Sequence, residues 1–333
     1  MAEITKMRDH LRENLARVEG QKVAVVGDVG LDEYLTGDVR RISPEAPVPV
    51  VEVKDRGFRV GLAANVAQNI HSLGGSSILV GLVGKDDSAQ TLQSLLKSSG
   101  VPAQHLVVDE LRPTTRKVRV MSGQHHVVRV DFEEKKFLSK KNEEDFIRVI
   151  ESQIGDCIGL ILQDYGKGVL SENLCQKIIG ICKKKNKKVV VDPHRTTPIS
   201  YYRGADLIKP NRDEAFILSG LNVDDLHLDD KTLTRVGRAI QEKANCKNLI
   251  ITQGKDGVTF FQDEKMTTIP TLPRQVYDVT GAGDTYLAAF CLAWFADFDP
   301  IAAAVMANYA AGVVVGKIGS VPCSKAELLE AMG

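Results

Sequence analysis

The stretch GLILQDYGKGVLSENLCQKIIGICKKKNKKVVVD, residues 159–192, contains the pattern that decides the fold. Two short apolar runs, Gly159–Gln163 and Lys188–Asp192, flank a helical pattern over Glu172–Lys184. Apolar runs of this length are typical of buried strands. A strand, a helix and a second strand in succession form a parallel βαβ unit with a right-handed crossover. This stretch therefore predicts an α/β protein.

The same alternation continues on both sides of this unit. Further strands are predicted at Lys22–Asp28, Ile78–Val83, Asp206–Ile208 and Leu249–Thr252. Further helices are predicted at Ala63–Leu73, Ser88–Ser98, Asn142–Ile154, Asp213–Ser219, Lys231–Ala244, Asp284–Phe295 and Ile301–Val315. A chain of 333 residues allows one large or two small domains. Because no internal repeat or low-complexity linker divides it, we expect one domain over residues 1–333.

Two stretches interrupt the alternation and predict a small β lid. Pro44, Pro47 and Pro49 lie within Leu31–Val53 and exclude a central strand there, since proline cannot donate to both neighbours. Alternation in residues 117–121 and 127–132, broken at Ser122-Gly123-Gln124, predicts a hairpin. The lid strands are thus expected at about 34–54 and 114–132. An apolar edge strand invites pairing, so we expect a homodimer through the lid.

Composition excludes several classes of partner. The 43 Lys+Arg residues balance 43 Asp+Glu residues, and no long basic run favours nucleic acid or an anionic membrane. The longest apolar run, Tyr286–Ala296, is too short to span a bilayer. The six cysteines form no CxxC pair, which is typical of reduced thiols, and the N-terminus lacks a signal-peptide pattern. We therefore expect a cytoplasmic protein that binds small molecules.

The stretch DVTGAGDT, residues 278–285, is the best candidate for chemistry. Gly281, Ala282 and Gly283 lead directly into an apolar helical run, and amides at a helix N-terminus favour a phosphate or a developing anion. Asp284, in the first turn, could accept a proton from an attacking hydroxyl. An ordinary helix start with a favourable acidic residue is the alternative. The sequence has no GxxxxGK[ST] motif and no GxGxxG after a strand, which disfavours P-loop and dinucleotide-binding enzymes.

DVTGAGDT resembles the C-terminal signature of the ribokinase (PfkB) family of sugar and nucleoside kinases. Gly61–Ala67, Asn211–Glu214 and Thr252–Gly257 resemble three further motifs of that family, in the family's order, over roughly residues 20–330. The resemblance implies a ribokinase-like three-layer α/β fold with a mainly parallel central sheet. It also implies an ATP-dependent kinase that uses Mg²⁺.

Within this family the chain is most similar to the kinase domain of the heptose kinase/adenylyltransferase enzymes. Arg41–Val50, Asp164–Gly168 and Ala307–Ser320 carry this likeness. It implies phosphorylation of D-glycero-D-manno-heptose 7-phosphate at O1, giving the 1,7-bisphosphate for ADP-heptose and lipopolysaccharide core synthesis. A kinase for another sugar, sugar phosphate or nucleoside is the alternative within the family. A regulator that binds nucleotide or sugar without turnover is the alternative of another class.

The resemblance also implies roles for single residues. Asp284 would be the base, with Gly281, Ala282 and Gly283 as the anion hole. The ATP-binding residues would be Lys209, Asn211, Thr252, Gly254, Gly257 and Asn308. The sugar would contact Asp28, Asp32, Gly61 and Asn65, and its phosphate would contact Lys167, Arg41 and Arg195. Glu214 would orient Mg²⁺ through water, and Asp278 and Thr280 would form a monovalent-cation loop, with K⁺ as the candidate ion.

Each of these roles has a structural alternative, and two positions depart from the family pattern. Asn211 and Glu214 have capping-box spacing, Asp28 could cap a turn, and Lys167 could be a solvated loop lysine. Leu62 stands where the family commonly has a second glycine, and His194 stands where a lysine is common. Both departures could border the sugar or its phosphate, so they leave the particular substrate open.

Overall fold

The main sheet of the computed structural model is mostly parallel. The structure describes residues 2–123, 125–221, 229–263, 265–271, 276–317 and 319–333. Within these ranges the main sheet has eight strands in the order β14-β13-β12-β11-β10-β9-β1-β4. The six strands β12, β11, β10, β9, β1 and β4 are parallel to one another, and β13 pairs antiparallel with both β12 and β14. Their bounds are β1 (Lys22–Gly27), β4 (Ser76–Val80), β9 (Gly159–Gln163), β10 (Lys188–Asp192), β11 (Leu207–Ile208), β12 (Asn248–Thr252), β13 (Val258–Gln262) and β14 (Lys265–Ile269).

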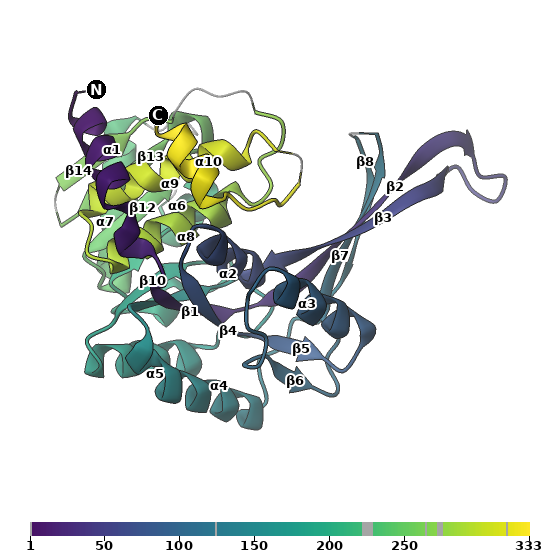
Figure 1. Cartoon of the computed structure of the whole chain (residues 1–333). Coiled ribbons are helices and arrows are strands. Elements are labelled where there is room, and N and C mark those ends of the chain that lie inside the picture. Colours follow the sequence, from purple (N-terminus) through teal and green to yellow (C-terminus); the bar gives the residue numbers. More distant parts are fainter. Residues whose placement is uncertain (1, 124, 222–228, 264, 272–275, 318) are drawn as a thin grey trace.

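Helices cover both faces of this sheet, as a three-layer fold requires (Figure 1). One layer contains α1 (Ala2–Asn14), α2 (Ala63–Ser72), α8 (Ala282–Phe295), α9 (Pro300–Val314) and α10 (Lys325–Ala331). The other contains α4 (Lys140–Gln153), α5 (Glu172–Lys184), α6 (Arg212–Ser219) and α7 (Asp230–Ala244). Short 3₁₀ helices occur at Leu15–Val18, Ile154–Asp156, Ile199–Tyr202 and Gly254–Asp256. The predicted three-layer α/β class is confirmed.

Alternation along the strands builds the two apolar cores. Val23 and Val25 of β1 pack into the core on the α8 side, whereas Ala24 and Val26 pack into the core on the α5 side. Successive side chains of a strand point to opposite faces, so a run that is apolar throughout fits only a strand covered on both sides. The continuous apolar runs in the sequence therefore indicate the parallel central strands.

The predicted strand over Ile78–Val83 is wrong, because the chain leaves the main sheet at Gly81. β4 ends at Val80, and β5 (Leu82–Gly84) instead pairs with β6 (Val107–Asp109) in a separate two-stranded sheet. A Cβ atom on Gly81 would lie 2.3 Å from Cγ1 of Val29, so only glycine fits at this turn. An apolar run has no local feature that shows where one strand stops and another begins.

A second sheet, which we call the lid sheet, contains β2 (Val29–Ile42), β3 (Pro49–Leu62), β7 (Thr115–Ser122) and β8 (His125–Phe132). Its order is β3-β2-β7-β8, so β3, which begins at Pro49, is an edge strand. The β2–β3 hairpin extends away from the main body (Figure 1). Gln124, part of the predicted hairpin break, lies outside the described residues.

Strand register gives the lid sheet a polar face and a mostly apolar face, and the latter also carries Glu33 opposite Val118. Asp32, Lys117 and Asp131 lie directly opposite one another across β2, β7 and β8. On the other face, Val118 and Val130 lie opposite each other. Helix α3 (Asp87–Ser98) packs against β2 and β3 at the base of the sheet. Because opposite residues share a face, the polar row is continuous across three strands.

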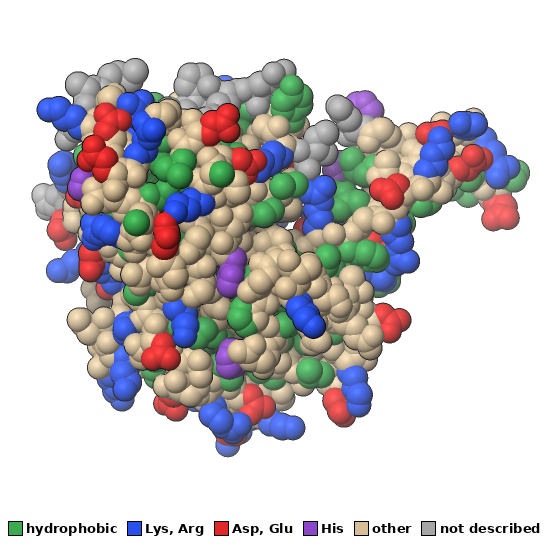
Figure 2. Space-filling model, viewed as in Figure 1, with side chains coloured by type: hydrophobic (Ala, Val, Ile, Leu, Met, Phe, Trp, Pro, Cys, Tyr) green, Lys and Arg blue, Asp and Glu red, His purple; other side chains and the backbone are tan. Residues whose placement is uncertain are grey.

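The surface has no strong bias of charge on the visible face, where acidic and basic side chains are interspersed (Figure 2). This distribution matches the equal numbers of acidic and basic residues in the sequence. Among the helices of the described ranges, none is both long enough and apolar enough to cross a membrane.

Candidate active site

Polar residues gather where the parallel strands end. Asp28 follows β1, Tyr165 lies two residues after β9, Asp192 ends β10, and Lys209 follows β11. The carboxyl ends of parallel strands meet at one edge of a sheet, which is where open α/β sheets bind ligands. Thr252, the last residue of β12, lies at the same edge.

The N-terminus of α8 lies at this edge and begins at a glycine in the left-handed region. Gly281 is the N-cap residue, with φ of 79°. A Cβ atom there would lie 2.5 Å from Oγ of Ser320, so the close approach also requires glycine. Gly283, in the first turn, is exposed and has open space above its α-carbon. The glycines therefore leave room for a ligand over the positive end of the helix.

Asp284 is held by two side-chain donors from other elements. The amide of Asn65, on α2, donates to Oδ2 at 2.8 Å, and the hydroxyl of Tyr165 donates to Oδ1 at 2.6 Å. Burial raises the pKa of Asp284 to about 6, although the two hydrogen bonds and Lys209 act in the opposite direction. A carboxylate with a pKa just below neutrality is suited to accept a proton at pH 7.

A buried ion pair lies beside Asp284. The Nζ atom of Lys209, which is 3% exposed, lies 3.0 Å from Oδ2 of Asp192. Nε2 of Gln163 lies 3.2 Å from Oδ2 of Asp192 and 3.5 Å from Oδ1 of Asp284, so it connects the two carboxylates. Burial, with Asp192 adding to it, raises the pKa of Glu214 to about 7. Lys209 also interacts electrostatically with Glu214 and Asp284.

The predicted nucleotide residues lie on adjoining segments. The backbone N–H of Thr252 donates to the carbonyl of Pro210, which brings the segment after β12 against the start of α6. Asn211 and Glu214 form the capping box that their spacing predicts. The loop of Gly254 and Gly257 contacts residue 271, and Nδ2 of Asn308, on α9, donates to the carbonyl of residue 270. Residues 272–275 lie outside the described ranges.

The acidic residues at this edge do not form a metal cage. Within the described ranges, no three His, Cys, Asp or Glu side chains converge closely enough to hold a metal ion. Glu214 is half-buried, and one of its carboxylate oxygens, Oε2, already accepts the backbone N–H of Asn211. Mg²⁺ is commonly held by one or two carboxylates, waters and substrate phosphates. The residues present fit that mode of binding and not an all-protein site.

The carboxylate of Asp28 accepts hydrogen bonds from the backbone of the loop after β9. Its carboxylate is buried and accepts backbone N–H groups of Tyr165, Lys167 and Val169 at 3.0, 3.1 and 3.2 Å. Burial, with Asp164 adding to it, raises the pKa of Asp28 to about 6. Asp28 therefore holds the loop after β9 in place, as the turn-capping interpretation expects, and its contact with a sugar stays a prediction.

The other predicted sugar residues lie where the lid sheet meets α2. Nη1 of Arg119 lies 2.6 Å from Oδ1 of Asp32, and a Cβ atom on Gly61 would lie 2.9 Å from Oδ2 of Asp32. Leu62, between Gly61 and α2, has φ of 60°. A non-glycine residue in this region costs of order 1–3 kcal/mol. The backbone thus keeps the conformation that glycine would favour, although the sequence departs from the family pattern here.

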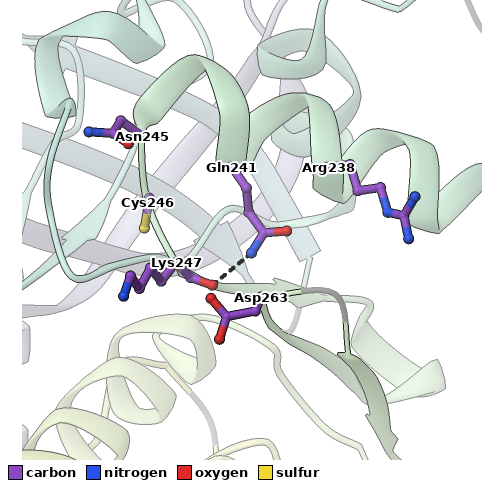
Figure 3. Close-up of a pocket in the computed structure, with 6 residues that line it drawn as sticks. All are labelled: Arg238, Gln241, Asn245, Cys246, Lys247 and Asp263. Carbon is purple, nitrogen blue, oxygen red and sulfur yellow. Dashed lines mark hydrogen bonds between the residues drawn. The ribbon is translucent and has the colours of Figure 1, made fainter.

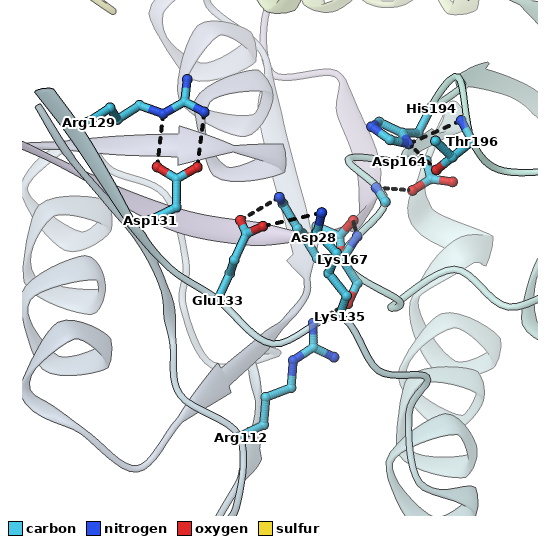
Figure 4. A network of polar contacts seen from close by, with 11 residues as sticks. Asp28, Arg112, Arg129, Asp131, Glu133, Lys135, Asp164, Lys167, His194 and Thr196 are labelled. Carbon is cyan, nitrogen blue, oxygen red and sulfur yellow. Dashed lines mark hydrogen bonds and ion pairs between the residues drawn. The ribbon is translucent and has the colours of Figure 1, made fainter. Parts of the chain in front are cut away.

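The three predicted phosphate residues lie in three different surroundings. Lys167 is buried and forms an ion pair with Glu133, which also lies near Lys135 (Figure 4). Arg41 is exposed near the far end of the β2–β3 hairpin, opposite Val50. Arg195 is exposed in the loop after β10. There its charge lowers the pKa of Glu214 against the effect of burial, which places it toward the nucleotide residues.

Asp278 closes the loop that precedes α8. Its Oδ1 accepts the backbone N–H and the hydroxyl of Thr280, and its Oδ2 accepts the backbone N–H of Gly319 at 2.8 Å. This arrangement ties the DVTGAGDT stretch to the segment after α9. It also means that hydrogen bonds already engage both oxygens of the carboxylate predicted to face a cation.

Sequence reasoning missed three residues of the Asp284 cluster: Gln163, Tyr165 and Asp192. Asp192 and Gln163 end neighbouring parallel strands, so the edge rule that selected Asp28 could have selected them as well. Tyr165 is different. Nothing in the sequence indicates that its hydroxyl reaches a residue 119 positions away.

A separate cavity lies at the opposite end of β12 from Thr252. It has a volume of about 300 Å³ and is open to the surface. Figure 3 shows the side chains that line it. Its lining residues are Arg238, Gln241, Asn245, Cys246, Lys247 and Asp263. Nε2 of Gln241 donates to the carbonyl of Lys247 across it. None of these residues belongs to the Asp284 cluster.

The fold and the cluster define a class of protein. A carboxylate at a glycine-initiated helix N-terminus, at the ligand-binding edge of a parallel sheet, is suited to accept the proton of a hydroxyl while the helix N-terminus stabilises a phosphoryl group in transfer. A family model for pfkB family carbohydrate kinases matches residues 20–327. The chain belongs to this family and is a sugar kinase.

Curated relatives of this chain are bifunctional proteins. The bifunctional protein HldE of Wolinella succinogenes is 39% identical over 92% of the chain, and that of Desulfatibacillum aliphaticivorans is 40% identical over 92%. The chain spans 64% and 62% of their respective lengths.

Solved structures show the same fold at low sequence identity. Ribokinase of Arabidopsis thaliana, complexed with ribose and ATP, has a TM-score of 0.73 and 20% identity, and covers 94% of this chain and 99% of its own. Phosphofructokinase-2 of Escherichia coli, in complex with potassium, has a TM-score of 0.75 and 18% identity, with 94% and 98% covered.

Proposed function

We propose that this protein transfers a phosphoryl group from ATP to O1 of D-glycero-D-manno-heptose 7-phosphate, giving the 1,7-bisphosphate for ADP-heptose and lipopolysaccharide core synthesis. The observation that carries the proposal is the position of Asp284. Its carboxylate, whose pKa is about 6, lies at the N-terminus of α8. The similarity to HldE proteins supports heptose 7-phosphate as the particular sugar.

In this proposal the residues around Asp284 have separate roles in catalysis and in sugar binding. Asp284 accepts the proton of the attacking hydroxyl, while backbone amides at Gly281, Ala282 and Gly283 stabilise the transferring group. Asn65 holds Asp284, and Asp32 and Gly61 border the sugar beneath the lid sheet.

ATP and its ions would bind on the α6 side of the cluster. Lys209, Asn211, Thr252, Gly254, Gly257 and Asn308 would line the nucleotide. Glu214 would orient Mg²⁺ through water, and Mg²⁺ would neutralise charge on the phosphates. Asp278 and Thr280 remain the proposed monovalent-cation loop, with K⁺ as the candidate ion.

ADP release with MgATP over a panel of sugar monophosphates and their unphosphorylated counterparts tests this function. We expect heptose 7-phosphate to give the highest kcat/KM, and ³¹P NMR to show the new phosphate on O1. A higher kcat/KM for another sugar or for a nucleoside would favour the alternative within the family. Calorimetric binding of ATP and sugar without any turnover would favour a regulator.

We further propose that the partner of the lid sheet is a second copy of this chain. Val128, Val130 and Phe132 of β8 are 50%, 43% and 45% exposed, on a strand at the edge of the sheet. Exposed apolar side chains grouped on one surface indicate an interaction site. A two-fold contact between lid sheets would cover this group and help to close both sugar sites.

Sedimentation velocity tests this dimer. We expect the wild type to sediment as a dimer and Val130→Lys as a monomer, because a charge on the apolar strand would be buried without a partner. Val108→Lys is the matched control, since Val108 is 48% exposed on β6, outside the lid sheet, and this variant should remain dimeric. A monomeric wild type at working concentrations would contradict the proposal.

A further inference from the structure

We propose that Lys117, on the polar face of the lid sheet, binds the phosphate group that the sugar substrate already carries. The inference deepens the proposed function and requires from it only that the substrate is a sugar monophosphate. It does not depend on which sugar is involved.

Lys117 lies close to one of the residues that hold Asp284. Lys117 lies on β7 and is half-buried, and its Nζ atom lies 5.5 Å from the centre of the Tyr165 ring. The hydroxyl of the same tyrosine donates to Asp284 at 2.6 Å. The ammonium and the carboxylate therefore interact with the same tyrosine side chain. A sugar bound over Tyr165 could place a hydroxyl at Asp284 and its phosphate at Lys117.

The carboxylates around Lys117 are engaged by other cations. Each carboxylate near Lys117 is already paired with another cation: Asp32 with Arg119 at 2.6 Å, and Asp131 with Arg129 at 2.9 Å. Glu133 is likewise paired, with Lys167 (Figure 4). Among the described residues, no carboxylate forms an ion pair with Lys117. Its charge is therefore available for a ligand.

The surroundings of Lys117 act on its charge in both directions. Burial lowers the pKa of Lys117, Asp32 and Asp131 raise it, and the positive charges of Lys167 and Arg119 lower it. A half-buried ammonium without an ion-pair partner among the described residues is unfavourable in the free protein. A phosphate dianion would remove that penalty, because it supplies the opposite charge at the same place.

The three residues that the sequence suggested for the sugar phosphate are less well placed than Lys117. Lys167 lies close by, but Glu133 neutralises it. Arg41 lies near the far end of the β2–β3 hairpin, and Arg195 lies toward Glu214. Lys117 combines an unpaired charge with a contact to Tyr165, which holds Asp284, whereas Lys167 is paired, Arg41 is remote and Arg195 lies on the nucleotide side.

Steady-state kinetics of Lys117→Met tests the inference, because methionine keeps the apolar stem of the side chain and removes its charge. For the sugar monophosphate that the wild type prefers, we expect kcat/KM to fall about 10- to 100-fold. The KM for MgATP and kcat/KM for the unphosphorylated sugar should not change. Lys117→Arg should retain most of the activity. Lys135→Met removes an exposed positive charge nearby and should behave like the wild type.

Three results would overturn the inference: no change in Lys117→Met, an equal loss for the phosphorylated and unphosphorylated sugars, or a wild type with no preference for the phosphorylated sugar. Urea unfolding of each variant checks that it folds. Calorimetric titration with heptose 7-phosphate gives the same comparison without turnover. If the wild type prefers another sugar monophosphate, the heptose proposal fails, and the Lys117 comparison is made with that sugar.

Discussion

Asp284→Asn is expected to lower kcat by at least about 10²- to 10⁴-fold, which is the usual contribution of a general base. Asparagine has the same size and keeps a hydrogen-bonding group toward Tyr165 and Asn65, but it cannot accept the proton of the sugar hydroxyl. Calorimetry should show sugar and MgATP affinities close to those of the wild type. ATP could bind slightly more tightly, since a negative charge beside its phosphates is removed.

The pH dependence provides a second test of the same residue. Burial raises the pKa of Asp284 from 3.8 to about 6, so wild-type kcat/KM should fall as the pH decreases through about 6, where the carboxylate becomes protonated. Stability should change in the opposite sense. The pKa of Asp284 is higher in the folded than in the unfolded protein. Its contribution to the free energy of unfolding therefore decreases as the pH rises from 3.8 to about 6.

Asp284→Asn removes this unfavourable ionisation. The variant should therefore unfold at pH 8 with a free energy no lower than that of the wild type, and this measurement separates lost chemistry from lost folding. Tyr165→Phe is a milder comparison. It removes a hydrogen bond that lowers the pKa of Asp284, so the acidic limb of its activity profile should move to higher pH. Near-full turnover of Asp284→Asn would assign the base to another residue.

Lys209→Met is expected to lower the free energy of unfolding by about 3–5 kcal/mol, the typical cost of removing one partner of a buried ion pair. Lys209 is 3% exposed and its Nζ lies 3.0 Å from Oδ2 of Asp192. Burial alone would lower the pKa of Lys209, but Asp192 raises it above its usual value. Without the ammonium, Asp192 remains buried beside Glu214 and Asp284 with no compensating charge. Urea unfolding at pH 8 measures this loss.

A double variant and a matched control support the interpretation. Lys209→Met combined with Asp192→Asn should recover part of the lost stability, because no isolated charge remains. Lys188→Met removes a lysine at the other end of β10, where its partner Asp297 is largely exposed, and should cost no more than about 1 kcal/mol. If Lys209→Met and Lys188→Met unfold alike, the buried pair does not stabilise the protein.

Local pattern was sufficient for the βαβ unit at the centre of the main sheet, but it did not indicate β13 and β14 or the end of β4 at Val80. The predicted β9, α5 and β10 have the bounds seen in the structure, because a five-residue apolar run and a helical period depend only on neighbouring residues. The prolines in the SPEAPVPVVEV stretch likewise indicated an edge strand. The glycine turn before Asp284 indicated a helix N-terminus suited to an anion. These features depend on chain conformation within a few residues.

What the sequence by itself determined is therefore the α/β class, the lid strands and the acid at the start of α8. Only the tertiary structure decided how the charges are paired. In the folded protein, Asp28 accepts three backbone amides from residues 165–169, and Lys167 forms an ion pair with Glu133. Lys117 lies beside Tyr165 without an ion-pair partner among the described residues. The physical reason is that an ion pair depends on distance and burial between residues far apart in the chain, and strand register, which local pattern does not specify, sets both.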